Sequence, residues 1–247
     1  MNTLITGASS GVGEALATEA AKRGDTLFLC GRNAERLEKV AAACRALNGG
    51  RVHTRVVDVT DRPAMEDWIA ACDAIAPLER VFANAGVSTG VETEENSRNT
   101  FAVNVGGCLN TVHPAVAVFR RRGGGQVVIT ASIAGYGPLK ACPAYSATKA
   151  CVKTWGLALR GMLARENIKV NVVCPGFIRS RMTDGNTCPM PFFMEADKAA
   201  RIILDRVERN VGLIAFPWPM RLATWFLSIL PHRLNEAVNR LLPKKVI

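Results

Sequence analysis

The chain alternates between short apolar runs and longer stretches in which apolar residues recur every three or four positions. The short runs predict strands at residues 2–6, 26–30, 51–57, 80–83, 126–130, 169–173 and 212–216. The longer stretches predict helices near 12–23, 33–47, 62–75, 97–121, 144–165 and 195–209. Because the strands are apolar almost throughout, we expect a parallel sheet buried on both faces. Right-handed crossovers would then build a doubly wound, Rossmann-type α/β sheet of about seven strands in one domain, residues 1–247.

Composition agrees with a single globular domain. The 247 residues are 49% hydrophobic and 21% charged, which is enough apolar material for a sizeable core. The eight cysteines form no CxxC or other metal-ligand spacing, and the three histidines have no metal-like partners, so we predict no metal site. This cysteine usage, and an N-terminus without a secretory signal pattern, lead us to expect a cytoplasmic protein.

The formal net charge of +10 bears on the partners of the protein. Residues 201–247 alone carry eight Arg and Lys against three Asp and Glu. A basic balance suits nucleic acid or an anionic membrane surface, but it also suits an ordinary solvated surface, which we favour on charge alone. No nucleic-acid-binding motif accompanies the charge, so we expect no nucleic-acid partner.

A glycine-rich turn follows the first predicted strand, in the sequence TGASSGVG. Its candidate cofactor-binding residues are Gly7, Ser9, Ser10, Gly11, Val12 and Gly13. Glycine permits a tight turn and a close approach of the backbone to a ligand. The alanine-rich helix that follows would offer its free N–H groups to a pyrophosphate. The turn therefore predicts dinucleotide binding, because it lies between a first strand and a helix.

The end of the second predicted strand bears on the choice of cofactor. NAD-binding sites usually place Asp or Glu here to accept hydrogen bonds from the ribose 2′-hydroxyl. This chain has Gly31 and Arg32 instead. A guanidinium pairs well with a 2′-phosphate, so we expect NADP(H) as cofactor. Two alternatives stay open, namely NAD(H) as cofactor and Arg32 as an ordinary surface-loop residue.

Taken in chain order, several motifs resemble those of the short-chain dehydrogenase/reductase family over residues 2 to about 182. They read TGASSGVG, VVDVTD, ANAG, FAVNVGG, VITASIAG, YSATK and CPGFIRS. The resemblance implies a catalytic tetrad of Asn104, Ser132, Tyr145 and Lys149, the last two also touching the cofactor. It assigns further cofactor contacts to Asp58, Val59, Asn84, Ala85, Gly86, Pro175, Gly176, Ile178 and Ser180.

Two positions depart from the family pattern. Ala83 stands where the family has the first asparagine of N-N-A-G, which removes one stabilising side-chain contact. Ser180 stands where threonine is usual, and its hydroxyl is able to bond the nicotinamide carboxamide in the same way.

The tyrosine and lysine of YSATK suit proton transfer during carbonyl reduction. Tyr145 and Lys149 lie one helical turn apart, on the same face. A free phenol has a pKa of about 10, and a neighbouring cation lowers it towards neutrality. We therefore expect Lys149 to lower the pKa of Tyr145. By the resemblance, Ser132 would hold the substrate carbonyl and Asn104 would support a water that leads protons away through Lys149.

Each of these residues also has an ordinary alternative. Ser132 suits a helix cap, Asn104 a buried amide, Tyr145 a core position and Lys149 the surface. The tetrad reading rests on all four occurring together on one nucleotide-binding fold.

Two segments near the C-terminus are candidates for substrate contact. Residues 181–200 read as a substrate lid that contains Met190, Phe192, Phe193 and Met194, which indicates either an apolar substrate or simple anchoring to the core. Residues 212–242 form an apolar segment interrupted by prolines, too broken for a membrane-spanning helix. It would lie on a membrane surface, pack on the sheet, line the pocket or meet another subunit.

Together these features predict an NADP(H)-dependent oxidoreductase that interconverts a carbonyl and an alcohol on a small, lipophilic substrate. The family resemblance suggests a homodimer or homotetramer through the helices at 97–121 and 144–165. The rival hypothesis is a catalytically silent protein that senses the cofactor or acts as a scaffold. A third reading, an epimerase or dehydratase, would need an extra sugar-nucleotide region that this chain lacks the length to hold.

Overall fold

A computed structural model describes residues 1–88, 91–184 and 189–241. Within those residues, seven parallel strands form one sheet in the order β3-β2-β1-β4-β5-β6-β7. The strands are β1 Asn2–Thr6, β2 Thr26–Gly31, β3 Val52–Val56, β4 Arg80–Ala83, β5 Gly125–Thr130, β6 Ile168–Pro175 and β7 Leu213–Phe216. The order reverses between β1 and β4, so the predicted doubly wound parallel sheet is confirmed.

Helices fill the connections between the strands, and in the described part of the chain two more follow the last strand. They are α1 Gly11–Lys22, α2 Ala34–Asn48, α3 Arg62–Ile75, α4 Glu94–Phe101, α5 Gly107–Arg122, α6 Pro143–Leu163, α7 Arg181–Asp184, α8 Ala196–Glu208, α9 Trp218–Ile229 and α10 His232–Leu241. Short 3-10 turns lie at Ile133–Tyr136 and Ala164–Glu166. The structure therefore adds α7, α9 and α10 to the predicted helices.

The helix predicted at 97–121 differs from a regular α-helix. It begins at Glu94, because the Thr93 hydroxyl accepts a hydrogen bond from the Asn96 N–H at 3.1 Å and caps it. A π-helical turn, Ala102–Gly106, then separates α4 from α5. The continuous stretch 94–122 is long and apolar enough to cross a membrane, yet half of its most apolar part is buried, as in the core helix of this fold.

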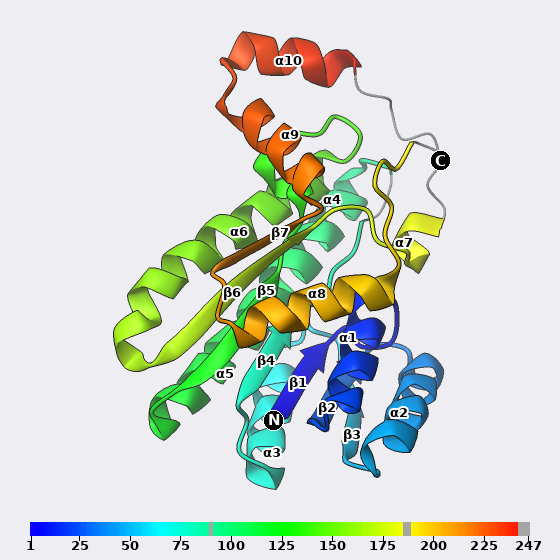
Figure 1. Ribbon diagram of the computed structural model, residues 1–247, viewed down its shortest axis with the longest axis vertical. Coiled ribbons are helices and arrows are strands. Elements are labelled where there is room, and N and C mark those ends of the chain that lie inside the picture. The colour runs from blue at the N-terminus through cyan, green and yellow to red at the C-terminus, as the bar shows by residue number, and fades with distance from the viewer. Residues whose placement is uncertain (89–90, 185–188, 242–247) are drawn as a thin grey trace.

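Two hydrophobic cores lie on opposite faces of the sheet, because successive strand side chains point to opposite faces. In β1, Leu4 joins the core beneath α3, α5 and α6, while Ile5 joins the core beneath α1, α2 and α8. Figure 1 shows these two helix layers and, at the opposite end from the N-terminus, α9 and α10 extending beyond the sheet. The site described below lies at that end.

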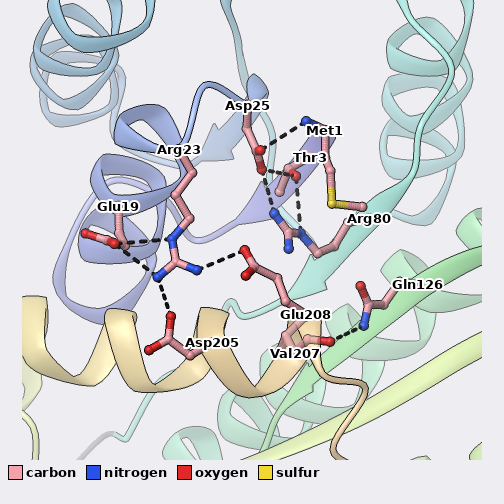
Figure 2. A network of polar contacts seen from close by, with 10 residues as sticks. All are labelled: Met1, Thr3, Glu19, Arg23, Asp25, Arg80, Gln126, Asp205, Val207 and Glu208. Atoms are coloured by element: carbon pink, nitrogen blue, oxygen red, sulfur yellow. Dashed lines mark hydrogen bonds and ion pairs between the residues drawn. The ribbon is translucent and has the colours of Figure 1, made fainter.

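The amino ends of the central strands enclose a buried ion pair, shown in Figure 2. Arg80 Nη2 lies 2.6 Å from Asp25 Oδ2, and both residues are almost fully buried. The Thr3 hydroxyl donates to the same carboxylate at 2.7 Å, and the Met1 ammonium lies 3.1 Å from its other oxygen. Nearby, Arg23 at the C-cap of α1 reaches Asp205 on α8 at 2.7 Å, which ties the end of α1 to α8.

Candidate active site

A cleft of about 680 Å³ lies at the carboxyl ends of the strands. Its wall is built from the glycine-rich turn, the segments that follow β4, β5 and β6, the first turns of α6, and the inner sides of α9 and α10. Ligands of open α/β sheets bind at this edge, where the strand order reverses. All but two of the predicted site residues line the cleft; Asp58 and Asn104 do not.

The glycine-rich turn is shaped by close backbone contacts. Gly7 has φ +66, and a Cβ there would lie 2.8 Å from the Cα of Ala85. A Cβ on Gly13 would lie 2.2 Å from the Gly7 carbonyl oxygen. A side chain at Gly7 would therefore clash with the segment after β4, and one at Gly13 would clash with the backbone of the turn itself. The N-cap of α1, Ser10, makes no side-chain cap, so the first N–H groups of the helix remain available to an anion.

Beside this turn, the end of β2 gathers cationic side chains. Arg32 lies at the cleft rim with its side chain 57% exposed, and its Nη1 is 3.7 Å from Asp58 Oδ2. Arg36, in the first turn of α2, also lines the cleft, and its buried Nε has no hydrogen-bond partner among the described residues. Arg36 was not among the predicted residues. Its position four residues beyond Arg32, just past the helix cap Asn33, is the signal that would have found it.

Asp58 serves the turn after β3 instead of the cleft wall. Its Oδ1 accepts hydrogen bonds from the N–H and the hydroxyl of Thr60, at 2.9 and 2.8 Å. Partial burial opposes ionisation of this carboxyl, but the Thr60 bonds and the Arg32 charge outweigh it and lower its pKa. Its neighbour Val59 does line the cleft.

Tyr145, Lys149 and Ser132 converge on one wall of the cleft. The Lys149 ammonium donates to the carbonyl of Thr130 at 2.8 Å, and it lies 5.7 Å from the centre of the Tyr145 ring. The hydroxyl of Ser132 is within hydrogen-bonding reach of the Tyr145 phenol. Ser132 also caps the turn after β5, accepting from the N–H of Ala134 at 3.1 Å. Ser132 therefore both caps a helical turn, as the ordinary alternative predicted, and lines the cleft.

Asn104 lies behind this wall and not on it. It is 2% exposed, and the π-helical turn directs its amide inward. The amide accepts from the Val87 N–H at 2.8 Å and donates to the Val87 carbonyl and the Thr148 hydroxyl, both at 3.0 Å. A Cβ on Gly86 would lie 3.2 Å from both Asn104 Oδ1 and Lys149 Nζ, so glycine leaves room for both groups beside the backbone here.

The electrostatics of the wall contradict one expectation. We expected Lys149 to lower the pKa of Tyr145; instead, burial raises the pKa of Tyr145 from 10.0 to about 12, although the Ser132 bond opposes this. Burial also lowers the pKa of Lys149 from 10.5 to about 8. Desolvation disfavours the charged form of each group. The lysine donates to the Thr130 carbonyl, so its charge does little to offset the desolvation of the phenol.

The segment predicted as a lid is partly tethered to the body. Residues 185–188, within the predicted 181–200, lie outside the described residues. Met194 exchanges backbone hydrogen bonds with Phe177 at 3.0 Å and Arg179 at 2.9 Å, and its side chain packs on the core. Pro189 and Pro191 instead line the cleft. Anchoring to the core therefore occurs at Met194, while contact of the segment with a substrate stays a prediction.

The apolar segment predicted near 212–242 divides in a similar way, and residue 242 lies outside the described part. Its first residues form β7. From α9, the side chains of Met220, Thr224 and Leu227 line the cleft, as do Asn235 and Val238 from α10. The start of the segment thus joins the sheet, while α9 and α10 contribute to the cleft lining. Contact with a membrane or with another subunit stays a prediction.

Comparison with known proteins agrees with this architecture. Residues 1–188 match the sequence family described as short chain dehydrogenase. An uncharacterised oxidoreductase of Myxococcus xanthus is 34% identical over 242 residues, covering 96% of this chain and 95% of that one. The chain therefore belongs to the short-chain dehydrogenase/reductase family, whose members are oxidoreductases that use NAD or NADP.

Two further relatives carry more specific names. The 17-beta-hydroxysteroid dehydrogenase 13 of Rattus norvegicus is 28% identical over 246 residues, which cover 96% of this chain and 82% of that protein. The crystal structure of L-sorbose reductase from Gluconobacter frateurii, complexed with NADPH and L-sorbose, superposes on this chain with a TM-score of 0.77. The two sequences are 25% identical. The superposition covers 87% of this chain and 94% of that one.

Proposed function

We propose that this protein is an NADP(H)-dependent oxidoreductase that interconverts a carbonyl and an alcohol on a small, lipophilic substrate. The observation that carries the proposal is the meeting of Tyr145, Ser132 and Lys149 in the same cleft as the glycine-rich turn. An acid, a carbonyl-orienting hydroxyl and a dinucleotide-binding turn are the parts that such a reaction requires.

The residues of the cleft fit a dinucleotide. The close contacts at Gly7 and Gly13 shape a cradle that a Cβ would fill, and the uncapped N-terminus of α1 suits a pyrophosphate. Arg32 and the unpartnered Nε of Arg36 would hold a 2′-phosphate, which supports NADP(H) over NAD(H). Bound there, the dinucleotide supplies the hydride. The hydroxyl of Ser180, at the cleft wall, would bond its carboxamide.

Tyr145 would protonate the carbonyl oxygen of the substrate. With its pKa raised to about 12, the phenol keeps its proton at neutral pH, so it carries the proton that the carbonyl oxygen needs as negative charge develops there. The Ser132 hydroxyl would hold the same oxygen beside it. Lys149 would return a proton to the phenol. Asn104 would position Lys149 indirectly, because its amide holds Val87 and Thr148, the residue before Lys149.

A lipophilic substrate follows from the lining of the cleft beyond Tyr145. Apolar residues predominate there, with Thr224 and Asn235 among them; the apolar ones are Val87, Leu139, Phe177, Met182, Pro189, Pro191, Met220, Leu227 and Val238. An apolar wall with few polar groups selects apolar ligands, since it leaves the polar groups of a hydrophilic ligand without partners. The similarity to a protein named as a hydroxysteroid dehydrogenase supports the same substrate class.

The remaining expectations complete the proposal. We propose that the segment carrying Pro189 and Pro191 covers the bound substrate, and that the protein is cytoplasmic. A homodimer or homotetramer would form through α5 and α6, where Leu157 and Met162 are 36% and 61% exposed.

The substitution Tyr145→Phe tests the proposed acid. The variant should lose at least about a thousandfold in turnover of NADPH with the best aldehyde or ketone of a panel, and fluorescence titration should show unchanged NADPH binding. The chain has two tyrosines, so Tyr136→Phe is the matched control; its hydroxyl lies outside the cleft lining, and the variant should keep full activity.

The same assay separates the rival functions. A Tyr145→Phe variant with near-native turnover would rule out the proposed acid. A wild-type protein that binds NADPH but consumes none with aldehydes, ketones or quinones would favour the cofactor-sensing alternative.

A further inference from the structure

Helix α9 presents two apolar faces instead of one. Trp218, Leu222, Trp225, Phe226 and Ile229 recur at the spacing of a single helical face. Met220, Thr224 and Leu227 recur at the same spacing on the opposite face, since each residue turns the helix by about 100°. A helix that packs on a domain normally needs only one such face.

The inner face of α9 belongs to the cleft. Met220, Thr224 and Leu227 line it together with Asn235 and Val238 of α10. The Asn235 amide donates to the Leu227 carbonyl at 2.7 Å, which joins α10 to the end of α9. The two helices thus form one wall of the space in which we propose that the substrate binds.

The outer face of α9 is open to solvent. Trp218 is 74% exposed, and the other four residues of that face are 51–58% exposed. Leu234 of α10, 55% exposed, lies close by in the chain. Scattered exposed apolar residues are ordinary, but a cluster that contains two tryptophans and a phenylalanine marks a binding surface. Figure 1 shows both helices at the periphery, with no element of the described chain beyond α10 to cover them.

Exposed cations accompany this face. Arg221 of α9 and Arg233 of α10 are exposed, and neither forms an ion pair with any residue in the described ranges. Tryptophan with arginine is the composition of helices that lie in the interface of a membrane, where the indole stays near the headgroups and the guanidinium meets lipid phosphate. A second copy of this face would instead bring like charges together.

We propose that α9 and α10 dock on an anionic phospholipid bilayer and form the entrance through which a lipid-soluble substrate reaches the cleft. The inference rests on the proposed function for the use of the cleft, but the docking surface itself does not. The outer face of α9 would enter the headgroup region, with Arg221 and Arg233 among the lipid phosphates. The inner face of the same helix would then lie between the bilayer and Tyr145.

Co-sedimentation of the full chain with vesicles tests the docking. Wild-type protein should pellet with vesicles of phosphatidylcholine containing about one third phosphatidylglycerol, and about tenfold less with phosphatidylcholine alone. The surface variant Trp225→Gln with Phe226→Gln should lose at least about tenfold in apparent affinity for the anionic vesicles. The matched control is Leu47→Gln with Ile75→Gln, two residues equally exposed on α2 and α3, and it should pellet as wild type does.

The outcomes distinguish a lipid bilayer from a second copy of the chain as the partner of the outer face of α9. Wild-type protein that stays in the supernatant, or a Trp225→Gln, Phe226→Gln variant that pellets like wild type, would overturn the proposal. A third result would also overturn it: wild-type protein that is a dimer by light scattering and does not pellet with vesicles, and a variant that is a monomer. The face would then bind a second copy of the chain. Tyr145→Phe should pellet normally, so a failure of the proposed reaction would leave the vesicle result unaffected.

Discussion

The two ends of the parallel sheet differ in whether a buried charge has a partner of opposite charge. At the amino end, Arg80 and Asp25 are both buried, and each charge has the other as its partner at 2.6 Å. At the carboxyl end, Lys149 is only 4% exposed, but its ammonium donates to the neutral carbonyl of Thr130 and forms no ion pair within the described chain. The Arg80 charge is neutralised by Asp25 and buried, whereas the Lys149 charge has no counterion among the described residues and faces the cleft.

This difference separates a structural role from a functional one. A buried pair stays charged because each partner replaces the lost water of the other, and removal of either partner is strongly destabilising. A buried amine without a counterion keeps its charge at a cost, which appears as the lowered pKa of Lys149. Perturbed groups that face a cavity are candidates for catalysis. The contrast can be tested by removing each charge in turn.

The largest effect on stability is expected at the amino end. Asp25→Asn leaves the Arg80 guanidinium buried without its carboxylate, so the free energy of unfolding should fall by about 3–5 kcal/mol in a denaturant titration. The exposed pair Arg98–Glu94, with side chains 78% and 79% exposed, gives the control. Glu94→Gln should change the same quantity by less than about 1 kcal/mol. Equal effects of the two substitutions would show that burial does not decide the strength of the pair.

At the carboxyl end, removal of the charge should stabilise the protein. Lys149→Met removes an amine whose pKa falls from 10.5 unfolded to about 8 folded. Below pH 8 the amine is protonated in both states, and the penalty of burying it is fully present, on the order of 3 kcal/mol. The lost bond to Thr130 offsets about 1 kcal/mol of the gain. The variant should therefore be more stable than wild type by about 2 kcal/mol at pH 7, while its turnover is lost.

The stability gained by Lys149→Met should depend on pH. Between pH 8 and 10.5 the unfolded chain binds more protons at this position than the folded protein does, so wild-type stability rises with pH across that window. The advantage of Lys149→Met should shrink over the same range. Exposed Lys169→Met should change stability by less than about 0.5 kcal/mol at every pH. A Lys149→Met variant that is less stable at pH 7 than wild type would contradict the inference of an uncompensated charge.

The smallest effect is expected at the exposed rim of the cleft. Arg32 is 57% exposed and 3.7 Å from Asp58, too exposed and too distant for a strong pair. Arg32→Ser should leave stability unchanged and reduce the preference for NADPH over NADH, measured as a ratio of kcat/KM, by about tenfold. Lys39→Ser, on the same helix as Arg36 but outside the cleft lining, should change neither. An unaltered cofactor preference in Arg32→Ser would show that Arg32 does not bind the 2′-phosphate.

Local sequence patterns were enough to predict much of this molecule. All seven strands were predicted, six of them from mainly apolar runs that burial on both faces requires; the edge strand β3 is only partly buried. The glycine spacing predicted the turn after β1, since no residue with a Cβ fits at Gly7 or Gly13. The four-residue spacing of Tyr145 and Lys149 placed both on one face of α6. Each of these inferences depends on steric or periodic rules that act within a few residues of the chain.

Only the tertiary structure decided how far each group is removed from water. The sequence shows that Lys149 neighbours Tyr145, but the depth of their burial, and hence the upward shift of the tyrosine pKa, comes from elements far apart in the chain. The same holds for Asn104, which packs behind the cleft, and for α9, whose inner face becomes a cleft wall. Solvation depends on everything that surrounds a side chain, whereas pattern and spacing depend only on its near neighbours in sequence.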